Sequence, residues 1–183
     1  MLREGEDKFT LNKEINNIID KYKCNLVGIT KYDIDILKML DGFIFQGGTD
    51  YTLDDLKVMD YLYKNDIPTL GICLGMQTMG IYKSGKLGFV LGHNFKKKYI
   101  HEVKIDTNSK LYDIINKDRV VVNSRHNEIL LFTDMHVAAK TLDGVIEAIE
   151  DSSKKFFIGV QWHPESLDDI TSKRLFNAFF ESI

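Results

Sequence analysis

The stretch that decides the fold is IPTLGICLGMQ, residues 67–77. Its apolar first part, residues 67–72, predicts a short buried strand, and a helix is expected to begin near Met76. Cys73 stands between them, with one glycine two positions before it and another two positions after it. A strand that passes through Gly-x-Cys-x-Gly into a helix predicts a nucleophile elbow, a strained turn in which larger neighbouring side chains would collide.

The predicted elbow gives Cys73 the surroundings of a nucleophile. The partial positive charge at the start of a helix favours a thiolate over a thiol. The backbone N–H of Leu74 is expected to point to the place where an oxyanion would form. A small cysteine in a tight turn explains the same residues, because short motifs also match by chance. On the Gly-x-Cys-x-Gly pattern alone, the two interpretations are evenly matched.

A second motif, QWHPE at residues 161–165, supplies the partners that such a nucleophile needs. Side chains two positions apart in an extended strand point to the same side, so His163 and Glu165 are expected to act together. Pro164 stiffens the link, and a carboxylate beside an imidazole orients it and stabilises its charged form. Taken alone, His-Pro-Glu is better explained as a plain turn. Together with Cys73, it completes a set of nucleophile, base and orienting carboxylate.

A third motif, QGGT at residues 46–49, follows an apolar stretch that predicts a strand over 42–45. In an open α/β sheet, sites form at the carboxyl ends of the strands. The unobstructed backbone N–H groups of Gly47 and Gly48 are therefore candidates to complete an oxyanion hole with Leu74. A simple glycine turn is the alternative, and without Cys73 it would be preferred.

The order of predicted elements indicates an α/β fold. The first half alternates helices and strands, which predicts a parallel sheet with helices on both faces. The second half, from about 88 to 162, is rich in strands and predicts a mixed sheet or a small antiparallel sheet beside the first. The expected helices are 11–22, 33–40, one from Thr52, 109–115 and 168–182, and the expected strands are 25–30, 42–45, 67–72, 99–105, 119–122, 135–140, 145–150 and 156–162. With no repeat and no linker, residues 1–183 are expected to form a single domain.

Composition excludes several classes of function. The chain has 183 residues, a net charge of −3 and 44% hydrophobic residues, which is ordinary for a globular protein. No basic patch predicts nucleic-acid binding, and no apolar run is long enough for a membrane helix. The first residues are charged and lack the core of a signal peptide, so a cytoplasmic location is expected. The two cysteines, Cys24 and Cys73, do not form a disulfide framework.

The three motifs, in this order, resemble the class I glutamine amidotransferase superfamily. They are most similar to its γ-glutamyl hydrolase branch, the peptidase C26 family that includes γ-glutamyl-γ-aminobutyrate hydrolase. GICLGMQ at 71–77 and GVQWHPE at 159–165 are specific to the superfamily, and VNSRH at 122–126 resembles an element of the branch. DGFIFQGG at 41–48 and AAKTLDGVIEAIE at 138–150 add to the similarity. The resemblance implies a flavodoxin-like, three-layer α/β/α fold with a mostly parallel central sheet and a small antiparallel sheet.

The resemblance also implies a reaction on glutamine or another γ-glutamyl amide. Cys73 would attack the side-chain carbonyl while backbone N–H groups of Leu74 and Gly48, or Gly47, hold the oxyanion. His163, oriented by Glu165, would protonate the departing amine or ammonia and then activate the water that hydrolyses the thioester. Substrate-binding roles are implied for Gln77, Ser124, Arg125 and His126.

The resemblance implies no metal and no cofactor. His93 and His101 match positions where the branch often has histidine, but they lack the spacing of a zinc site and are interpreted as surface or edge-strand residues. The chain also departs from the branch in two ways. Its first ten residues contain no apolar strand, so it is one strand short, truncated or misassigned at its start, and a partner chain is one source of the missing pairing. The loop after Gly47-Gly48 is short, which leaves the pocket more open.

Three functions fit these residues. The first is a stand-alone γ-glutamyl hydrolase, which the VNSRH stretch favours. The second is a glutaminase subunit that supplies ammonia to a separate synthase. The third is a non-catalytic binding module, against which the complete set of Cys73, His163 and Glu165 argues. The expected partners are a small γ-glutamyl substrate or glutamine, with a homo-oligomer or a synthase as candidate protein partners.

Overall fold

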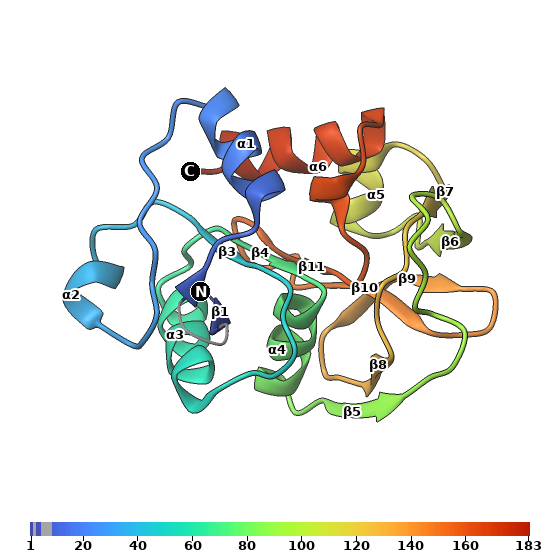
Figure 1. Cartoon of the computed structure of the whole chain (residues 1–183), viewed down its shortest axis with the longest axis horizontal. Coiled ribbons are helices and arrows are strands. Elements are labelled where there is room, and N and C mark those ends of the chain that lie inside the picture. The colour runs from blue at the N-terminus through green and yellow to red at the C-terminus, as the bar shows by residue number, and fades with distance from the viewer. Residues whose placement is uncertain (2, 5–8) are drawn as a thin grey trace.

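A seven-stranded mixed sheet forms the centre of the computed structural model, which describes residues 1, 3–4 and 9–183 (Figure 1). Its strand order is β3-β4-β11-β10-β9-β6-β7. The β3–β4 and β4–β11 pairs are parallel, and the remaining four pairs are antiparallel. In this order the strands are Phe43–Phe45, Thr69–Ile72, Phe157–Val160, Ile146–Glu150, His136–Thr141, His101–Ile105 and Arg119–Val122.

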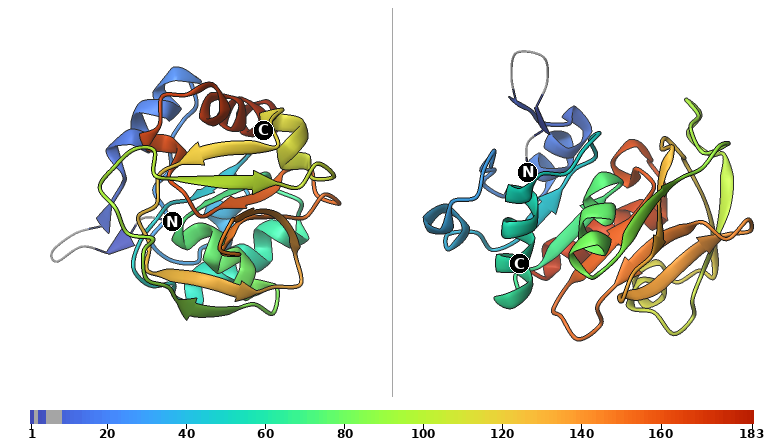
Figure 2. Two further views of the ribbon diagram at one scale, coloured as in Figure 1. Left: turned by 90° about the vertical axis from the view of Figure 1, so that its right-hand side faces the viewer. Right: turned by 90° about the horizontal axis from the view of Figure 1, so that it is seen from below.

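Helices cover both faces of the sheet, as the α/β prediction requires (Figure 2). One core cluster joins the sheet to α1 (Lys13–Lys21), α5 (Lys110–Ile115) and α6 (Ile170–Glu181). The other cluster joins it to α3 (Leu53–Lys64) and α4 (Leu74–Tyr82). The centre of the sheet is its most enclosed part, because every residue of the adjacent strands β4, β11 and β10 is buried. The nucleophile elbow predicted after residue 72 therefore rests on the best-packed part of the fold.

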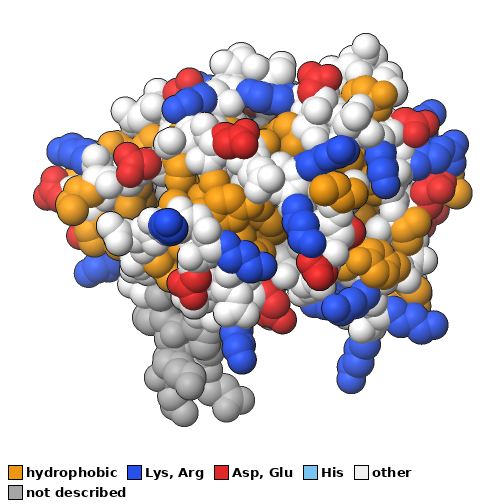
Figure 3. Space-filling view, turned by 90° about the horizontal axis from the view of Figure 1, so that it is seen from above, with side chains coloured by type: hydrophobic (Ala, Val, Ile, Leu, Met, Phe, Trp, Pro, Cys, Tyr) orange, Lys and Arg blue, Asp and Glu red, His pale blue; other side chains and the backbone are white. Residues whose placement is uncertain are grey.

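The outer face over α1 and α6 shows how the charge is distributed. Lysines, arginines and acidic side chains are interspersed there around a group of hydrophobic side chains (Figure 3). In the part of the chain that the structure describes, no helix has the length and apolar character needed to cross a membrane.

A capping box starts α3 where the sequence predicts a helix to begin. The Thr52 hydroxyl accepts a hydrogen bond from the Asp55 backbone N–H at 3.1 Å, and the Asp55 carboxylate accepts one from the Thr52 N–H at 2.8 Å. These bonds satisfy two groups that the end of a helix otherwise leaves unpaired. The helix predicted from Thr52 is confirmed.

A small antiparallel sheet lies beside the central one, as expected from the strand-rich second half. It pairs β5 (Lys86–Phe89) with β8 (Glu128–Phe132). Neither strand was among those predicted. They pack against α4, where Gly80 lies so close to Leu130 that a side chain at this position would collide with it.

The strand predicted over 25–30 is wrong, because that segment is irregular. Its apolar residues Leu26 and Val27 remain 45% and 49% exposed, and only Ile29 is buried. A run of apolar residues forms a strand only where a neighbouring strand offers hydrogen bonds, and none does here among the described residues. The helix predicted over 33–40 shortens to α2 (Ile34–Leu37).

The described residues at the N-terminus, 1, 3–4 and 9–10, add no strand to the central sheet. The described residues form β1 (Arg3–Glu4) and β2 (Phe9–Thr10), which pair only with each other. The predicted absence of an apolar first strand also covers residues 2 and 5–8, which lie outside the described part. The N-terminal amine of Met1 donates a hydrogen bond to the carbonyl of Ile44 in β3 at 3.2 Å.

Glu150 caps the N-terminus of α5, and its substitution tests how much this contact stabilises the fold. Its two carboxylate oxygens accept hydrogen bonds from the backbone N–H groups of Lys110 (2.7 Å) and Leu111 (2.9 Å), and the side chain is buried. Glu150→Gln replaces one acceptor by a donor, so we expect the free energy of unfolding to fall by about 1–3 kcal/mol. Urea denaturation measures this change. Glu102→Gln, at an exposed ion pair with Arg119, is the control and should change stability by less than about 0.5 kcal/mol. Equal effects of the two substitutions would contradict the role of Glu150.

Candidate active site

Cys73 occupies a strained turn between β4 and α4, as predicted. Its φ of 53° and ψ of −105° lie outside the regions that a side chain normally adopts. The Cys73 N–H donates to the carbonyl of Val160 at 2.8 Å, and its own carbonyl accepts from the N–H of Gln77 at 3.1 Å. A side chain at Gly75 would collide with the carbonyl of Phe45. The glycine therefore allows α4 to start directly against β3, and the thiol is held at the positive end of this helix.

His163 and Glu165 meet in a tight turn after β11. The Nδ1 atom of His163 lies 2.7 Å from Oε1 of Glu165. The expectation that the two side chains share one side of an extended strand is wrong, because Pro164–Ser166 form a 3₁₀ helix (η1) that His163 precedes. Pro164 suits the first position of such a turn, since it has no N–H to leave unpaired. The 3₁₀ turn brings the Glu165 carboxylate back to the His163 imidazole.

The environment of His163 keeps its imidazole charged. Burial by itself lowers the pKa of His163, but hydrogen bonds and charge interactions with Cys73 and Glu165 outweigh it and raise the pKa to about 10. The imidazole is therefore protonated at neutral pH, and it interacts with the Cys73 side chain in this charged form. Cys73 precedes His163 by 90 positions along the chain, and the fold brings it together with His163 and Glu165 in one site.

Asn123 holds the backbone of His163 from both sides. Its side-chain Nδ2 donates to the carbonyl of His163 at 2.8 Å, and its Oδ1 accepts from the N–H of His163 at 2.7 Å. Asn123 is fully buried, so no water competes for these bonds. It lies within the VNSRH stretch but was not among the predicted site residues. Its position directly after the apolar strand β7 (Arg119–Val122) marks it as a candidate polar residue, but nothing in the sequence identifies its partner.

Two further polar side chains reach the site without having been predicted. Asn12, the N-cap of α1, places its Nδ2 at 3.4 Å from Oε1 of Glu165 and so joins α1 to the carboxylate. Gln161 donates from its Nε2 to the sulfur of Cys73 at 3.5 Å. A helix-capping asparagine can be recognised in a sequence, but its contact with residue 165 depends on the tertiary fold.

Gly47 borders the site, whereas Gly48 lies further out. A side-chain carbon built on Gly47 would lie 2.8 Å from Cε1 of His163 and 3.6 Å from Cβ of Cys73. Gly48 is exposed, and Leu74 is the first residue of α4. The oxyanion roles of Gly47, Gly48 and Leu74 stay predictions, and Gly47 is the better placed of the two glycines.

Three of the four predicted substrate-binding residues are buried in internal hydrogen bonds. Gln77 donates to the carbonyl of Glu128 at 2.9 Å and to Oε1 of Gln161 at 3.2 Å. The Ser124 hydroxyl donates to the carbonyl of His93 at 2.6 Å. His126 lies between Ser124 and the carbonyl of Glu128, at 3.2 Å from each, and burial lowers its pKa to about 4.

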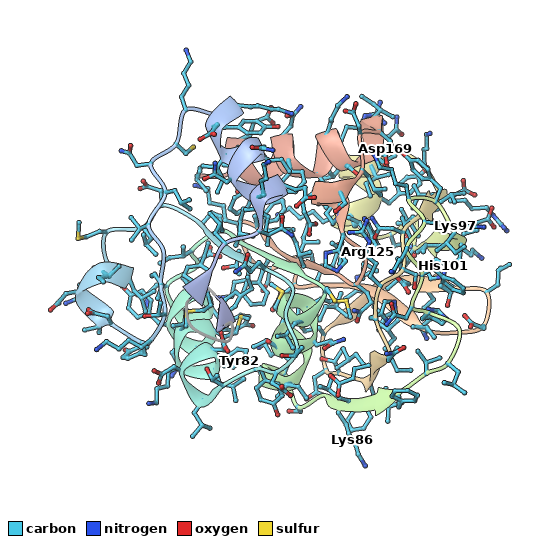
Figure 4. All side chains as sticks on the ribbon, viewed as in Figure 1. Tyr82, Lys86, Lys97, His101, Arg125 and Asp169 are labelled. Carbon is cyan, nitrogen blue, oxygen red and sulfur yellow. The ribbon has the colours of Figure 1, made fainter. Side chains whose placement is uncertain are left out.

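Arg125 is the predicted substrate-binding residue that is partly open to solvent. Its guanidinium donates to the hydroxyl of Ser166 at 2.9 Å, next to Glu165 in η1. It points from the VNSRH segment towards the turn that carries His163 (Figure 4). Two hollows of about 290 and 370 Å³ lie elsewhere on the surface, one beside Tyr99 and one beside Tyr82. Neither includes Cys73 or His163.

The interpretation of His93 and His101 as surface or edge-strand residues is wrong. His93 is only 3% exposed, and His101 begins β6, which lies between β9 and β7 inside the sheet. Burial lowers the pKa of His101 to about 4, with smaller contributions from neighbouring histidines, so this imidazole is neutral. The His93 ring lies tilted against the rings of His101 and His126, with centroids 4.9 and 5.1 Å away.

Comparisons with known proteins agree with this fold. The sequence model of the Peptidase C26 family matches residues 52–165, more than half of the chain. A glutamine amidotransferase-like protein of Rickettsia prowazekii is 28% identical over 206 aligned residues, which cover 73% of each chain. GMP synthase (glutamine-hydrolyzing) of Francisella tularensis subsp. novicida is 30% identical over 150 residues. This match covers 78% of the present chain but only 27% of that synthase.

A solved structure shows the same fold. A protein of Thermoplasma acidophilum, described as one subunit of a GMP synthase, superposes with a TM-score of 0.77 at 19% identity, covering 93% of this chain and 86% of the other. The fold is thus that of the class I glutamine amidotransferases, and the class of protein is a hydrolase that acts on C–N amide bonds. Within this class, the chain belongs to the Peptidase C26 family.

Proposed function

We propose that the protein hydrolyses the γ-glutamyl amide of glutamine or of a γ-glutamyl amine, with Cys73 as nucleophile. The observation that supports this most is the arrangement around the sulfur. A thiol on a strained elbow faces an imidazole that Glu165 binds at 2.7 Å and whose pKa is raised to about 10. A structural cysteine would need neither the strain nor the charged partner.

The proposed reaction has two halves. The Cys73 thiolate attacks the γ-carbonyl carbon, and the carbonyl oxygen becomes an oxyanion held by the N–H groups of Leu74 and Gly47 or Gly48. His163 donates its proton to the departing nitrogen, which leaves as ammonia or an amine, and a thioester remains. His163 then takes a proton from water, the hydroxide attacks the thioester, and glutamate leaves with regeneration of the thiolate.

The substrate-binding residues divide into two groups under this proposal. Arg125, at the turn next to Glu165, is the one that would contact the substrate. Gln77, Ser124 and His126 are buried and would act by positioning their neighbours. Gln77 fixes the amide of Gln161, whose other end donates to the Cys73 sulfur. We place all of these residues in one domain that spans residues 1–183.

Gly47→Ala tests how closely the backbone must pass the imidazole. The added methyl carbon would lie 2.8 Å from Cε1 of His163, well inside the normal separation of about 3.5–4 Å between carbon atoms. We expect His163 to shift and kcat/KM for glutamate release to fall by about 100-fold, since a displacement of about 1 Å in a catalytic group has this effect. Gly28→Ala, at an exposed position, is the control. Wild-type activity in Gly47→Ala would remove Gly47 from the proposed site.

A second candidate function is a glutaminase subunit that supplies ammonia to a synthase. The observation that favours it is the match to a GMP synthase. The present chain aligns with only 27% of that protein, so it corresponds to one part of a larger synthase. In such an assembly, the chain alone would hydrolyse glutamine slowly and a synthase partner would stimulate it. A homo-oligomer is the corresponding partner for the stand-alone hydrolase.

One experiment separates the two functions. The purified protein is incubated with glutamine and with a panel of γ-glutamyl amines, and glutamate release is followed with Cys73→Ala as control. Faster release from a γ-glutamyl amine than from glutamine supports the stand-alone hydrolase. Slow release from glutamine alone that a synthase partner accelerates supports the subunit. Release that persists in Cys73→Ala would contradict both.

A further inference from the structure

A cluster of buried ligand atoms lies outside the proposed catalytic site. We propose that His93, His101 and Glu147 bind one divalent transition-metal ion, with Zn²⁺ as the ion that their chemistry fits. The three residues come from the loop after β5, the start of β6 and the middle of β10. Figure 4 places His101 on the side of the molecule where β6, β7 and β9 lie.

The distances in the cluster fit a metal centre. One ligand atom from each of the three residues lies within 4.8 Å of the other two. Oε1 of Glu147 is 3.8 Å from Nδ1 of His93 and 3.5 Å from Nε2 of His101. Bonds of about 2.0–2.2 Å to tetrahedral zinc place neighbouring ligand atoms about 3.3–3.6 Å apart. The cluster is thus slightly wider than an occupied site, and small side-chain rotations would close it.

Within the described residues, the proposed ligand atoms have no hydrogen-bond partner. Glu147 is 0% exposed, and neither of its carboxylate oxygens has a hydrogen-bond partner within the described residues. The same holds for Nδ1 of His93 and Nε2 of His101. An unpaired buried carboxylate costs several kcal/mol unless a cation or hydrogen bonds compensate it. A divalent ion at this point would satisfy four otherwise orphaned atoms at once.

Asp143 prepares His93 for this role. Its Oδ2 lies 3.0 Å from Nε2 of His93, on the far side of the ring from the cluster. When Nε2–H donates to this carboxylate, the lone pair of Nδ1 remains free and faces Glu147. Carboxylate–histidine pairs of this kind orient metal-binding imidazoles and raise their basicity. No such pair is needed for a histidine that only fills space.

His126 is a neighbour of the cluster and not one of the proposed ligands. Its Nε2 lies 3.5 Å from Oε1 of Glu147, but both ring nitrogens already have partners in Ser124 and the carbonyl of Glu128. The ion would therefore fasten the loop after β5, β6 and β10 beneath the VNSRH segment. That segment also carries Asn123, which holds His163. We infer a structural ion that stabilises the VNSRH segment and, through Asn123, the position of His163.

Metal binding is measured on the full chain after chelator treatment, by calorimetric titration with Zn²⁺. The Cys73→Ala background removes the thiol, which is a second place where zinc could bind. One equivalent is expected to bind in this background. Glu147→Gln and His101→Ala should each weaken binding more than about 100-fold, and Asp143→Asn by about 10–100-fold. Co²⁺ should give a visible absorption without the sulfur-to-cobalt band of a thiolate ligand.

His136→Ala is the matched control. This histidine also has two carboxylate neighbours, Asp106 at 2.8 Å and Glu150 at 3.4 Å, but it is 40% exposed and already hydrogen-bonded. Its loss should leave the zinc affinity unchanged. Circular dichroism of each metal-free variant establishes that it is folded, and His101→Ala serves if Glu147→Gln is not. No stoichiometric binding, or binding that neither ligand variant weakens, would overturn the proposal.

Discussion

Cys73→Ala is expected to lower glutamate release from glutamine or a γ-glutamyl amine by about 10⁴-fold or more. The substitution removes the only atom that can form the proposed thioester, and loss of a nucleophile in comparable sites costs at least this much. The change is small in volume and lies in a packed turn, so the fold should persist. A coupled assay for glutamate measures the rate, and circular dichroism checks that the variant is folded.

Cys24→Ala is the matched control for this prediction. Cys24 is the second cysteine of the chain, it is partly buried, and its thiol donates to the carbonyl of Tyr22. Its removal should leave glutamate release unchanged. Equal losses in the two variants would show that thiol loss acts through the fold and not through a nucleophile.

Glu165→Gln should have the second largest effect, a loss of about 10³-fold in kcat/KM. The amide can still lie beside His163, but it cannot stabilise the imidazolium that protonates the leaving group. Glu165 contributes both a hydrogen bond and a charge to the raised pKa of His163. In the variant, the pKa of His163 should therefore fall from about 10 towards its ordinary value near 6.5. An NMR titration of the imidazole measures this shift directly.

The raised pKa of His163 also determines how the free energy of unfolding changes with pH. Because the folded-state pKa of His163 lies above its unfolded value, its contribution to stability is complete below pH 6.5 and is lost as the pH rises through about 10. Wild-type stability should decline across this window, and the decline should be smaller in Glu165→Gln. Glu14→Gln, on the exposed first turn of α1, is the control. An unchanged pKa of His163 in Glu165→Gln would refute the proposed role of the carboxylate.

The sequence predicts the core of the site well because its motifs have strict local geometry. The Gly-x-Cys-x-Gly spacing at Cys73, between a predicted strand and a predicted helix, predicts an elbow, and the structure confirms this turn. The contacts of Asn12 with Glu165 and of Asn123 with His163 could not be predicted in the same way. They join residues that are far apart in the chain, and nothing local to either asparagine specifies its partner.

The errors in the fold prediction have the same cause. Residues 25–30 have the composition of a buried strand, but the fold gives them no neighbouring strand. Strands β5 and β8 carry a weak alternation and form because they pair with each other. His93 and His101 look like surface residues in the sequence, since only the folding of β10 brings Glu147 beside them. Pairing between distant segments decides each of these cases.

The two hydrogen bonds of Asn123 have a consequence for protein engineering. They copy the donor and acceptor pattern of a backbone pair, although they come from a side chain 40 positions away in the sequence. The orientation of the imidazole is therefore encoded in two segments and not in one. A chimera that exchanges the His-Pro-Glu turn for that of a homologue must exchange the Val122–His126 segment with it. A designer who transplants only the turn would obtain a well-folded protein with a misdirected base.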